Sequence, residues 1–203
     1  MLQKYLIAGL GNPEKRYEKT RHNIGFEVVK HLASKHNIEF TEKKKVRGLM
    51  SSFSTDKEKI YLLMPLTYMN DSGISVRLAA DFYEIPLANI LIIVDDVAID
   101  LGEFRIKTGS GTGGHNGLKS VEQHLRTNDY PRLKIGVGKN PGNLSDYVLG
   151  KFTVNEQKTL PGLIEKASGF VEIFIKYGLT EAMNKANIRA KKIQNEETIN
   201  DQG

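Results

Sequence analysis

The stretch Ile90-Leu91-Ile92-Ile93-Val94-Asp95-Asp96 is the most informative segment of this chain. An aliphatic run with no polar alternation predicts a strand that is buried on both faces, as in the central sheet of an α/β protein. The two aspartates follow at the carboxyl end of this strand, where open α/β sheets usually build their functional sites. Asp95 and Asp96 are therefore the first candidate site residues.

On the amino-terminal side of this strand, the chain alternates between strand and helix patterns. Residues 4–8 predict a buried strand, which ends in the turn Gly9-Leu10-Gly11-Asn12-Pro13. Apolar residues at helical spacing begin at Ile24, with Asn23 as the expected N-cap. Residues 49–54 and 59–64 are expected to pair as a hairpin across a charged turn.

The remaining segments repeat this alternation. Ser72 is expected to cap a helix that carries Ile74, Leu78 and Phe82 on one face. Strands are expected at 103–107 and 133–137, and helices after Asn116, over 155–177 and over 180–186. This order predicts an α/β fold, a single-domain three-layer sandwich whose central sheet is mixed because of the hairpin and otherwise mostly parallel.

Composition limits the domain organisation and the chemistry. The chain has 203 residues, no cysteine and a formal net charge of +5 at pH 7. This length suits one core, so we expect one domain over residues 1–187 and a polar, disordered tail over residues 188–203. The lack of cysteine excludes disulfides and thiolate metal sites and fits a cytoplasmic location. The positive charge attracts polyanions, although it does not by itself establish nucleic-acid binding. No stretch approaches the roughly 18 apolar residues of a membrane span, so we expect no membrane partner.

A set of polar residues lies just beyond a strand or at the entrance of a helix: Asn12, His22, Asn70, Asp95 and Asn116. Loops at the ends of regular elements are where scaffolds usually place reactive groups. Taken singly, each asparagine is equally well explained as a turn former or a cap, and His22 as a capping or core histidine.

Other kinds of site are excluded or disfavoured. The sequence contains neither a G-x-S-x-G nucleophile elbow nor an H-E-x-x-H zinc helix. Gly109, Gly111 and Gly114 match the dinucleotide pattern G-x-G-x-x-G between a strand and a helix. That pattern needs an acidic residue at the end of a second strand about 20 residues later, and Asp129 falls in a loop instead. We therefore expect no nicotinamide cofactor and no metal ion.

Several motifs, in order along the chain, resemble those of the bacterial-type peptidyl-tRNA hydrolases. They are Gly9-Leu10-Gly11-Asn12-Pro13, the run from Tyr17 to Gly25 with Thr20-Arg21-His22-Asn23, Pro65-Leu66-Thr67-Tyr68-Met69-Asn70, Asp95-Asp96, and Gly113-Gly114-His115-Asn116-Gly117. The similarity extends from Leu6 to about Met183, which is nearly the whole chain.

The resemblance implies an enzyme that hydrolyses the ester between peptide and tRNA in peptidyl-tRNAs released prematurely from ribosomes, and so recycles tRNA. By the family's motifs, His22 is the catalytic base and Asp95 its paired carboxylate. The residues at substrate-binding positions are Asn12, Tyr17, Met69, Asn70 and Asn116. The implied partner is peptidyl-tRNA, bound at its acceptor stem and CCA end by a monomer without a cofactor.

These residue types suit that reaction. An imidazole ordinarily titrates near pH ~6.5, so at neutral pH it can take a proton from water attacking the ester carbonyl. A carboxylate bonded to the other ring nitrogen would fix the tautomer and stabilise the imidazolium. Asparagine amides can donate to the carbonyl oxygen and accept from the peptide N–H. Asn70 and Asn116 are candidates for that last contact, which distinguishes peptidyl from aminoacyl esters. We expect direct attack by water.

For tRNA, the resemblance points to a basic surface beside the site. Arg105, Lys107 and Lys134 are expected to contribute to it, and Arg105 and Lys107 alternate along one strand and so share a face. The denser run Lys43-Lys44-Lys45 is better explained as a solvated loop.

Two alternatives remain open at this stage. The chain could be a non-catalytic tRNA- or RNA-binding relative with a role in RNA processing, although the presence of His22, Asp95 and all three asparagines argues against this. It could also be a hydrolase of another acyl ester, which the basic surface disfavours.

Overall fold

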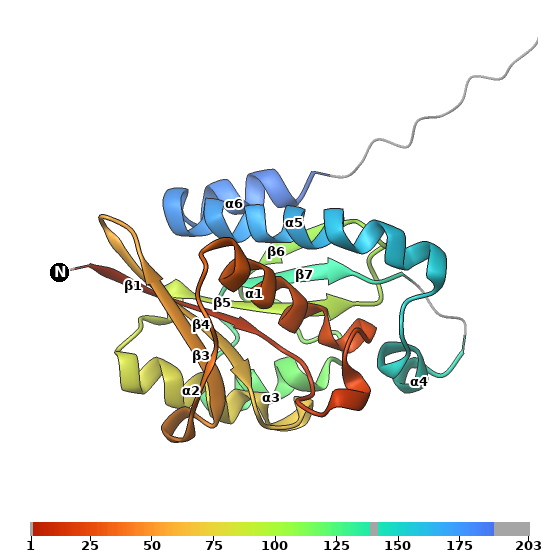
Figure 1. Cartoon of the computed structure of the whole chain (residues 1–203), viewed down its shortest axis with the longest axis horizontal. Helices are drawn as coiled ribbons and strands as arrows, with labels where there is room; N and C mark the ends of the chain where they lie inside the picture. Colours follow the sequence, from red (N-terminus) through yellow and green to blue (C-terminus); the bar gives the residue numbers. More distant parts are fainter. Residues whose placement is uncertain (1, 139–141, 189–203) are drawn as a thin grey trace, which may run out of the picture.

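The computed structural model describes residues 2–138 and 142–188 of the chain (Figure 1). Within these ranges the strands are β1 (Gln3–Gly9), β2 (Thr41–Lys43), β3 (Gly48–Ser54), β4 (Glu58–Pro65), β5 (Ile90–Asp96), β6 (Phe104–Lys107) and β7 (Arg132–Gly136). The helices are α1 (Ile24–Lys35), α2 (Ser72–Tyr83), α3 (Asn116–Leu125), α4 (Leu144–Leu149), α5 (Val154–Tyr177) and α6 (Leu179–Ala186). The expected tail at 188–203 lies outside the described residues, apart from Ile188.

The described strands form one mixed sheet in the order β2-β3-β4-β1-β5-β7-β6. The inner strands β4, β1, β5 and β7 are parallel to one another. The antiparallel pairs lie at the two edges, where β3 forms the expected hairpin with β4, β2 pairs with β3, and β6 pairs with β7. The prediction of a mixed, mostly parallel sheet is confirmed.

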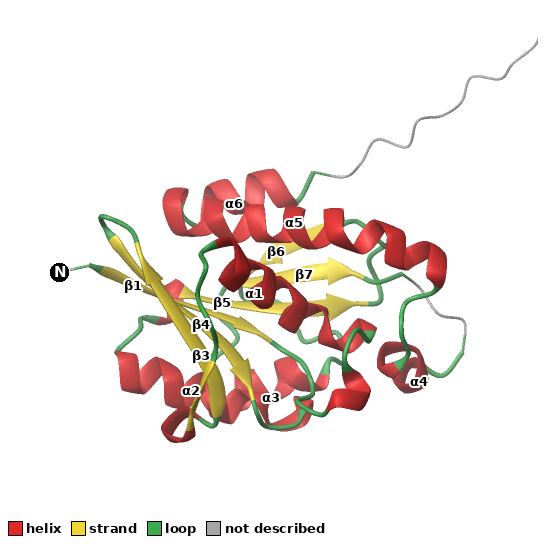
Figure 2. Ribbon diagram, viewed as in Figure 1, coloured by secondary structure: helices red, strands yellow, loops and turns green. Residues whose placement is uncertain are grey.

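Helices cover both faces of this sheet, as the secondary-structure colours of Figure 2 show. One hydrophobic core packs α1, α5 and α6 against the sheet, and the other packs α2 and α3 against the opposite face. Strand β5 supplies both cores, because Leu91 and Ile93 enter the first and Ile90, Ile92 and Val94 the second. All five are at most 1% exposed, which confirms the three-layer sandwich and the doubly buried central strand.

Helix α2 has Asp71 rather than Ser72 at its N-cap position, and it buries a different face from the one that the sequence suggested. Phe82, expected inside, is 54% exposed, and Ile74 and Leu78 are only partly buried. The buried residues of α2 are small: Ser72, Gly73, Ser75, Val76, Ala79 and Ala80. Helix α3 crosses so close that a Cβ at Gly73 would lie 2.1 Å from the backbone oxygen of Ser120. The predicted face was wrong because close helix contact favours small residues over large ones.

Two segments form short regular elements that were not expected from the sequence. The lysine-rich segment, interpreted as a solvated loop, begins with the edge strand β2 and continues in a 3-10 turn over Lys44–Val46. Its first residues are nonetheless exposed. Helix α4 has only 6 residues, which is too short for a periodic pattern to reveal. Among the described helices, none is both long and apolar enough to cross a membrane.

The start of α1 lies directly against the carboxyl end of β5. A Cβ at Gly25 would meet the backbone oxygen of Ile93 at 2.5 Å, so only glycine allows this approach. The 3-10 turn Arg21–Asn23 precedes α1 and carries His22. The close contact therefore places His22 beside the end of β5, where Asp95 lies.

Candidate active site

A pocket of about 510 Å³ lies where the carboxyl ends of the central strands meet the start of α1. Six of the residues predicted for catalysis or substrate binding line it: Asn12, His22, Met69, Asn70, Asp95 and Asn116. Lys134, predicted to contact tRNA, lines it as well. Tyr17, Arg105 and Lys107 are not part of this lining, so the structure brings together most but not all of the predicted residues.

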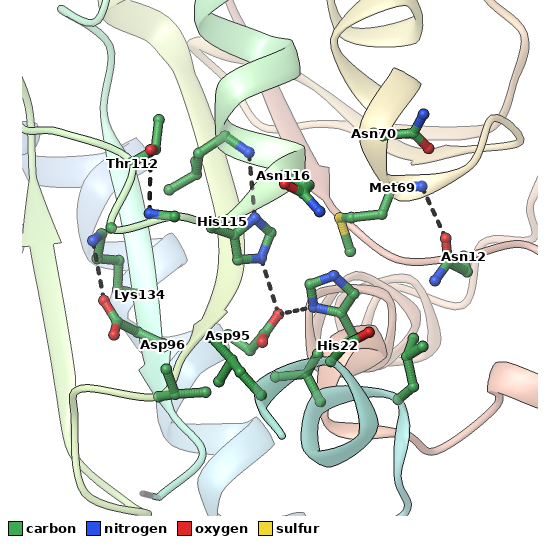
Figure 3. A pocket seen from close by; sticks show the side chains of 18 of the residues that line it. Asn12, His22, Met69, Asn70, Asp95, Asp96, Thr112, His115, Asn116 and Lys134 are labelled. Carbon is green, nitrogen blue, oxygen red and sulfur yellow. Dashed lines mark hydrogen bonds and ion pairs between the residues drawn. The ribbon is translucent and has the colours of Figure 1, made fainter. Parts of the chain in front are cut away.

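Asp95 is bonded to two imidazoles. Its Oδ1 lies 2.8 Å from Nδ1 of His22 and 3.1 Å from Nε2 of His115. A carboxylate can only accept, so both ring nitrogens donate. Nε2 of His22 keeps its lone pair, and Figure 3 shows this nitrogen directed away from Asp95, toward Met69. This nitrogen is the one with which His22 can act as a base.

The environment keeps Asp95 ionised. Burial by itself raises the pKa of the Asp95 carboxyl, but attraction to His115 and hydrogen bonds from His115 and His22 outweigh it. Together they hold this pKa below its ordinary value. Asp95 is 3% exposed, so its negative charge is poorly screened by water and acts strongly on the two rings. Asp95 can therefore stabilise a positive charge on His22.

His115 is a member of the site that the sequence reasoning did not select. As the N-cap of α3 it accepts the Leu118 backbone N–H on Nδ1 at 3.3 Å, so its proton is on Nε2 and points to Asp95. Its ring centroid lies 4.8 Å from that of His22. The signal was present in the motif Gly113-Gly114-His115-Asn116-Gly117. A histidine before a helix is, however, fully explained as a cap, and only proximity reveals the second bond.

Asn12 is oriented by its neighbours. Its Oδ1 accepts the Met69 backbone N–H at 2.8 Å, so its Nδ2 is the atom left to donate to a ligand. Asn23 holds the Asn12 backbone from both sides, because Asn23 Oδ1 accepts its N–H and Asn23 Nδ2 donates to its carbonyl, each at 2.9 Å. Asn23 occupies the N-cap position of α1, as predicted, but its side chain makes no capping bond to the helix. Its amide joins the loop after β1 to the turn that carries His22.

The other two asparagines lie on the exposed side of the pocket. Asn70 belongs to the 3-10 turn Met69–Asp71 and Asn116 is the first residue of α3. Asn116 Oδ1 is 3.4 Å from Nζ of Lys119, and within the described part of the chain no hydrogen bond engages the Asn70 side chain. Both amides are accessible and can pair with a peptide group.

Asp96 points away from Asp95, because side chains alternate along a strand. Its Oδ2 lies 3.0 Å from Nζ of Lys134, and its Oδ1 accepts the Ala98 backbone N–H at 2.8 Å. Lys134 is therefore buried and already paired, which differs from the exposed phosphate ligand that its basic character suggested. Its charge remains at the edge of the pocket (Figure 3).

The register of β6 and β7 gathers four basic side chains on one face of the sheet. Arg105 lies opposite Lys134, and Lys107 opposite Arg132. Side chains alternate along a strand, so these four share a face, while the intervening residues of both strands enter the hydrophobic core. Arg132 is fully buried and bonded to Glu122, whereas Lys107 is exposed and Arg105 is half-buried. Arg105 also donates to the Asn187 carbonyl at 3.2 Å.

Among the described residues, the side chains that could ligate a metal ion together are His22, Asp95 and His115. Their ligand atoms lie within 4.8 Å of one another. A bound ion would have to replace the two protons that the imidazoles donate to Asp95, and the ligands of one zinc ion lie roughly 3.3 Å apart. Hydrogen bonding alone explains this cluster, and a metal-free site stays a prediction.

Comparison with known proteins places the chain among close relatives. A family model described as peptidyl-tRNA hydrolase matches residues 6–196. A peptidyl-tRNA hydrolase of Clostridium botulinum is 46% identical over 183 residues, which make up 90% of this chain and 95% of that protein. One from Clostridium acetobutylicum is 46% identical over 183 residues, covering 90% of this chain and 97% of its own.

The fold of this chain is also similar to that of a solved peptidyl-tRNA hydrolase structure. The crystal structure of a peptidyl-tRNA hydrolase from Acinetobacter baumannii matches with a TM-score of 0.84 at 39% identity. The match covers 90% of this chain and 94% of that one. Sequence and structure therefore point to the same relatives.

Proposed function

This chain belongs to the bacterial peptidyl-tRNA hydrolase family, and we propose that its pocket hydrolyses the ester of peptidyl-tRNA through a water molecule that His22 activates. The substrate is peptidyl-tRNA released prematurely from ribosomes, and hydrolysis recycles the tRNA. One observation carries the assignment of the base: Asp95 engages Nδ1 of His22 at 2.8 Å and leaves Nε2 available on the pocket side.

The proton moves in two steps. Nε2 of His22 takes a proton from water as the oxygen attacks the ester carbonyl, and a tetrahedral intermediate forms. The imidazolium is stabilised by Asp95 across the short hydrogen bond. When the intermediate collapses, the same proton goes to the leaving ribose oxygen, which frees tRNA and a peptide carboxylate. His115 acts as a positioning residue here, because its bond to Asp95 holds the carboxylate in place.

The asparagines supply the neutral contacts. Nδ2 of Asn12, oriented by the bond from Met69 to its Oδ1, donates to the carbonyl oxygen as negative charge develops. Asn70 and Asn116 pair with the peptide amide. An aminoacyl ester carries an ammonium group at that place, and desolvating this charge beside neutral amides is costly. The site therefore favours peptidyl esters over aminoacyl esters.

The tRNA lies along the basic face of β6 and β7. Lys107 and Arg105 provide phosphate contacts. Lys134, which is buried and paired with Asp96, attracts the tRNA through its positive charge without touching a phosphate. This face continues into the pocket at Lys134, so the CCA end reaches His22 while the acceptor stem rests on β6. The enzyme acts in the cytoplasm as a monomer, without metal or cofactor. Met69 supplies an apolar part of the pocket wall, and Tyr17, outside it, takes a peripheral role.

The test is release of N-acetylated amino acid from tRNA by purified protein in excess chelator. Wild type releases it, and His22→Ala loses about 10²–10⁴-fold in kcat, the usual contribution of a general base. His31→Ala is the matched control, since His31 lies on the partly exposed side of α1, and it retains full activity. If the wild-type protein binds the charged tRNA but does not release the acetylated amino acid, the protein is a non-catalytic relative. Loss of activity in chelator overturns the metal-free mechanism.

A further inference from the structure

Helix α4 presents apolar side chains to the catalytic pocket. Leu144, Val148 and Leu149 line the pocket that contains His22 and Asp95. Leu144 is 50% exposed and Leu149 is 36% exposed, so neither belongs to the buried hydrophobic cores. Exposed apolar side chains on one wall of an otherwise polar pocket indicate contact with an apolar part of a ligand.

So short a helix needs tertiary contacts to hold its place, and Tyr147 provides them. The Tyr147 hydroxyl donates to the Val137 carbonyl at 2.8 Å, next to the end of β7. Its ring lies under the guanidinium of Arg21, with 4.2 Å between the guanidinium carbon and the ring centroid. Tyr147 therefore joins α4 to the sheet and to the residue that precedes His22.

Arg21 completes the connection. It is 5% exposed, and its backbone N–H donates to the Gly150 carbonyl at 3.1 Å. Its guanidinium donates to the Lys151 carbonyl and to Glu156, each at 2.7 Å. A planar guanidinium can stack on a ring and donate along its edge at the same time, which lysine cannot do. Arg21 thus fixes α4 and the segment after it relative to His22.

We propose that α4, held in place by Arg21, is a specificity-determining wall that takes the apolar side chain of the peptide's C-terminal residue. The proposal rests on the proposed function, since the ester carbon must lie beside Nε2 of His22. The side chain of that residue is attached to the Cα that is bonded to the ester carbonyl carbon, so it reaches the nearest wall of the same pocket. In Figure 3 the teal ribbon of α4 lies on the opposite side of His22 from Asn70. With the peptide amide at the asparagines, the side chain faces α4.

The experiment compares one tRNA body charged with N-acetyl-leucine or with N-acetyl-glycine. Wild type prefers the leucyl ester by about tenfold or more in kcat/KM, as apolar pockets discriminate by 10- to 200-fold. Leu149→Ser makes the wall itself polar. Arg21→Lys removes the planar guanidinium that stacks on Tyr147 and positions α4. Both variants reduce the preference to within about threefold, mainly through KM of the leucyl ester. The glycyl ester has no side chain for the wall, so its kcat/KM changes little in Leu149→Ser.

Arg77→Gln is the matched control, because it breaks an exposed ion pair with Asp81 on α2, away from the pocket. It keeps the wild-type preference. Equal losses on both esters in Leu149→Ser overturn the proposal, as does a wild type without preference. If Arg21→Lys does not fold, Leu149→Ser at its exposed position still decides. Failure of wild type to hydrolyse either ester overturns the proposed function, and the wall with it.

Discussion

Replacing Asp95 by asparagine separates the charge of this side chain from its shape. Asp95→Asn keeps an acceptor oxygen within reach of His22 and His115 but removes the negative charge. In the wild type, an imidazolium at His22 would lie about 4 Å from that charge, on a buried side chain. At an effective dielectric constant of about 20, this attraction is worth about 4 kcal/mol. Since 1.36 kcal/mol is tenfold in rate, kcat should fall by about 10³.

The assay is steady-state release of acetylated amino acid from tRNA, with kcat and KM determined separately. KM should change little, because Asp95 is 3% exposed and touches the ring rather than the tRNA. Asp96→Asn is the matched control. It removes a carboxylate that faces Lys134 instead of the imidazoles, so its kcat should stay within about tenfold of wild type. A loss smaller than tenfold in Asp95→Asn would refute the assignment of Asp95 as the group that stabilises the protonated base.

Three further predictions concern stability and tRNA binding. The folded-state pKa of Asp95 lies below its unfolded value of about 3.9, so its contacts stabilise the fold above that pH and this stabilisation is lost as pH falls through the folded pKa. Urea unfolding between pH 6 and pH 2 should show the loss as a falling free energy of unfolding in wild type. An identical pH profile in Asp95→Asn would contradict it. Lys107→Ala should weaken tRNA affinity and lower the slope of log affinity against log salt by about 1, and an unchanged slope would exclude a phosphate contact there. Gly73→Ala should lower the free energy of unfolding by about 1–3 kcal/mol or more, because its Cβ would meet the Ser120 backbone. Gly162→Ala in α5 has open space around it and should raise the free energy of unfolding by about 0.5–1 kcal/mol. Equal effects of the two substitutions would show that the α2–α3 crossing is not rigid.

The local pattern of the sequence was enough for the main elements. The aliphatic run at 90–94 and the alternation of strand and helix signals predicted β5 and an α/β sandwich, and both are confirmed. Burial depends on the hydrophobicity of each side chain, so the pattern of apolar residues within one segment is enough to predict whether it is a strand or a helix. The motifs also selected six residues that line one pocket, because loops at the carboxyl ends of parallel strands converge.

The pairing of these groups depended on the tertiary structure. His22 and Asp95 are 73 residues apart in the chain, and the second bond to Asp95 comes from His115, which the sequence suggested only as part of a motif. Asn23 lies at the predicted N-cap position, but its side chain bonds the Asn12 backbone rather than the helix. Helix α4, which forms one side of the pocket, has no periodic pattern in the sequence. The physical reason is the short range of a hydrogen bond. Its partner is whichever group the fold brings within about 3 Å, and a linear pattern carries no measure of that distance.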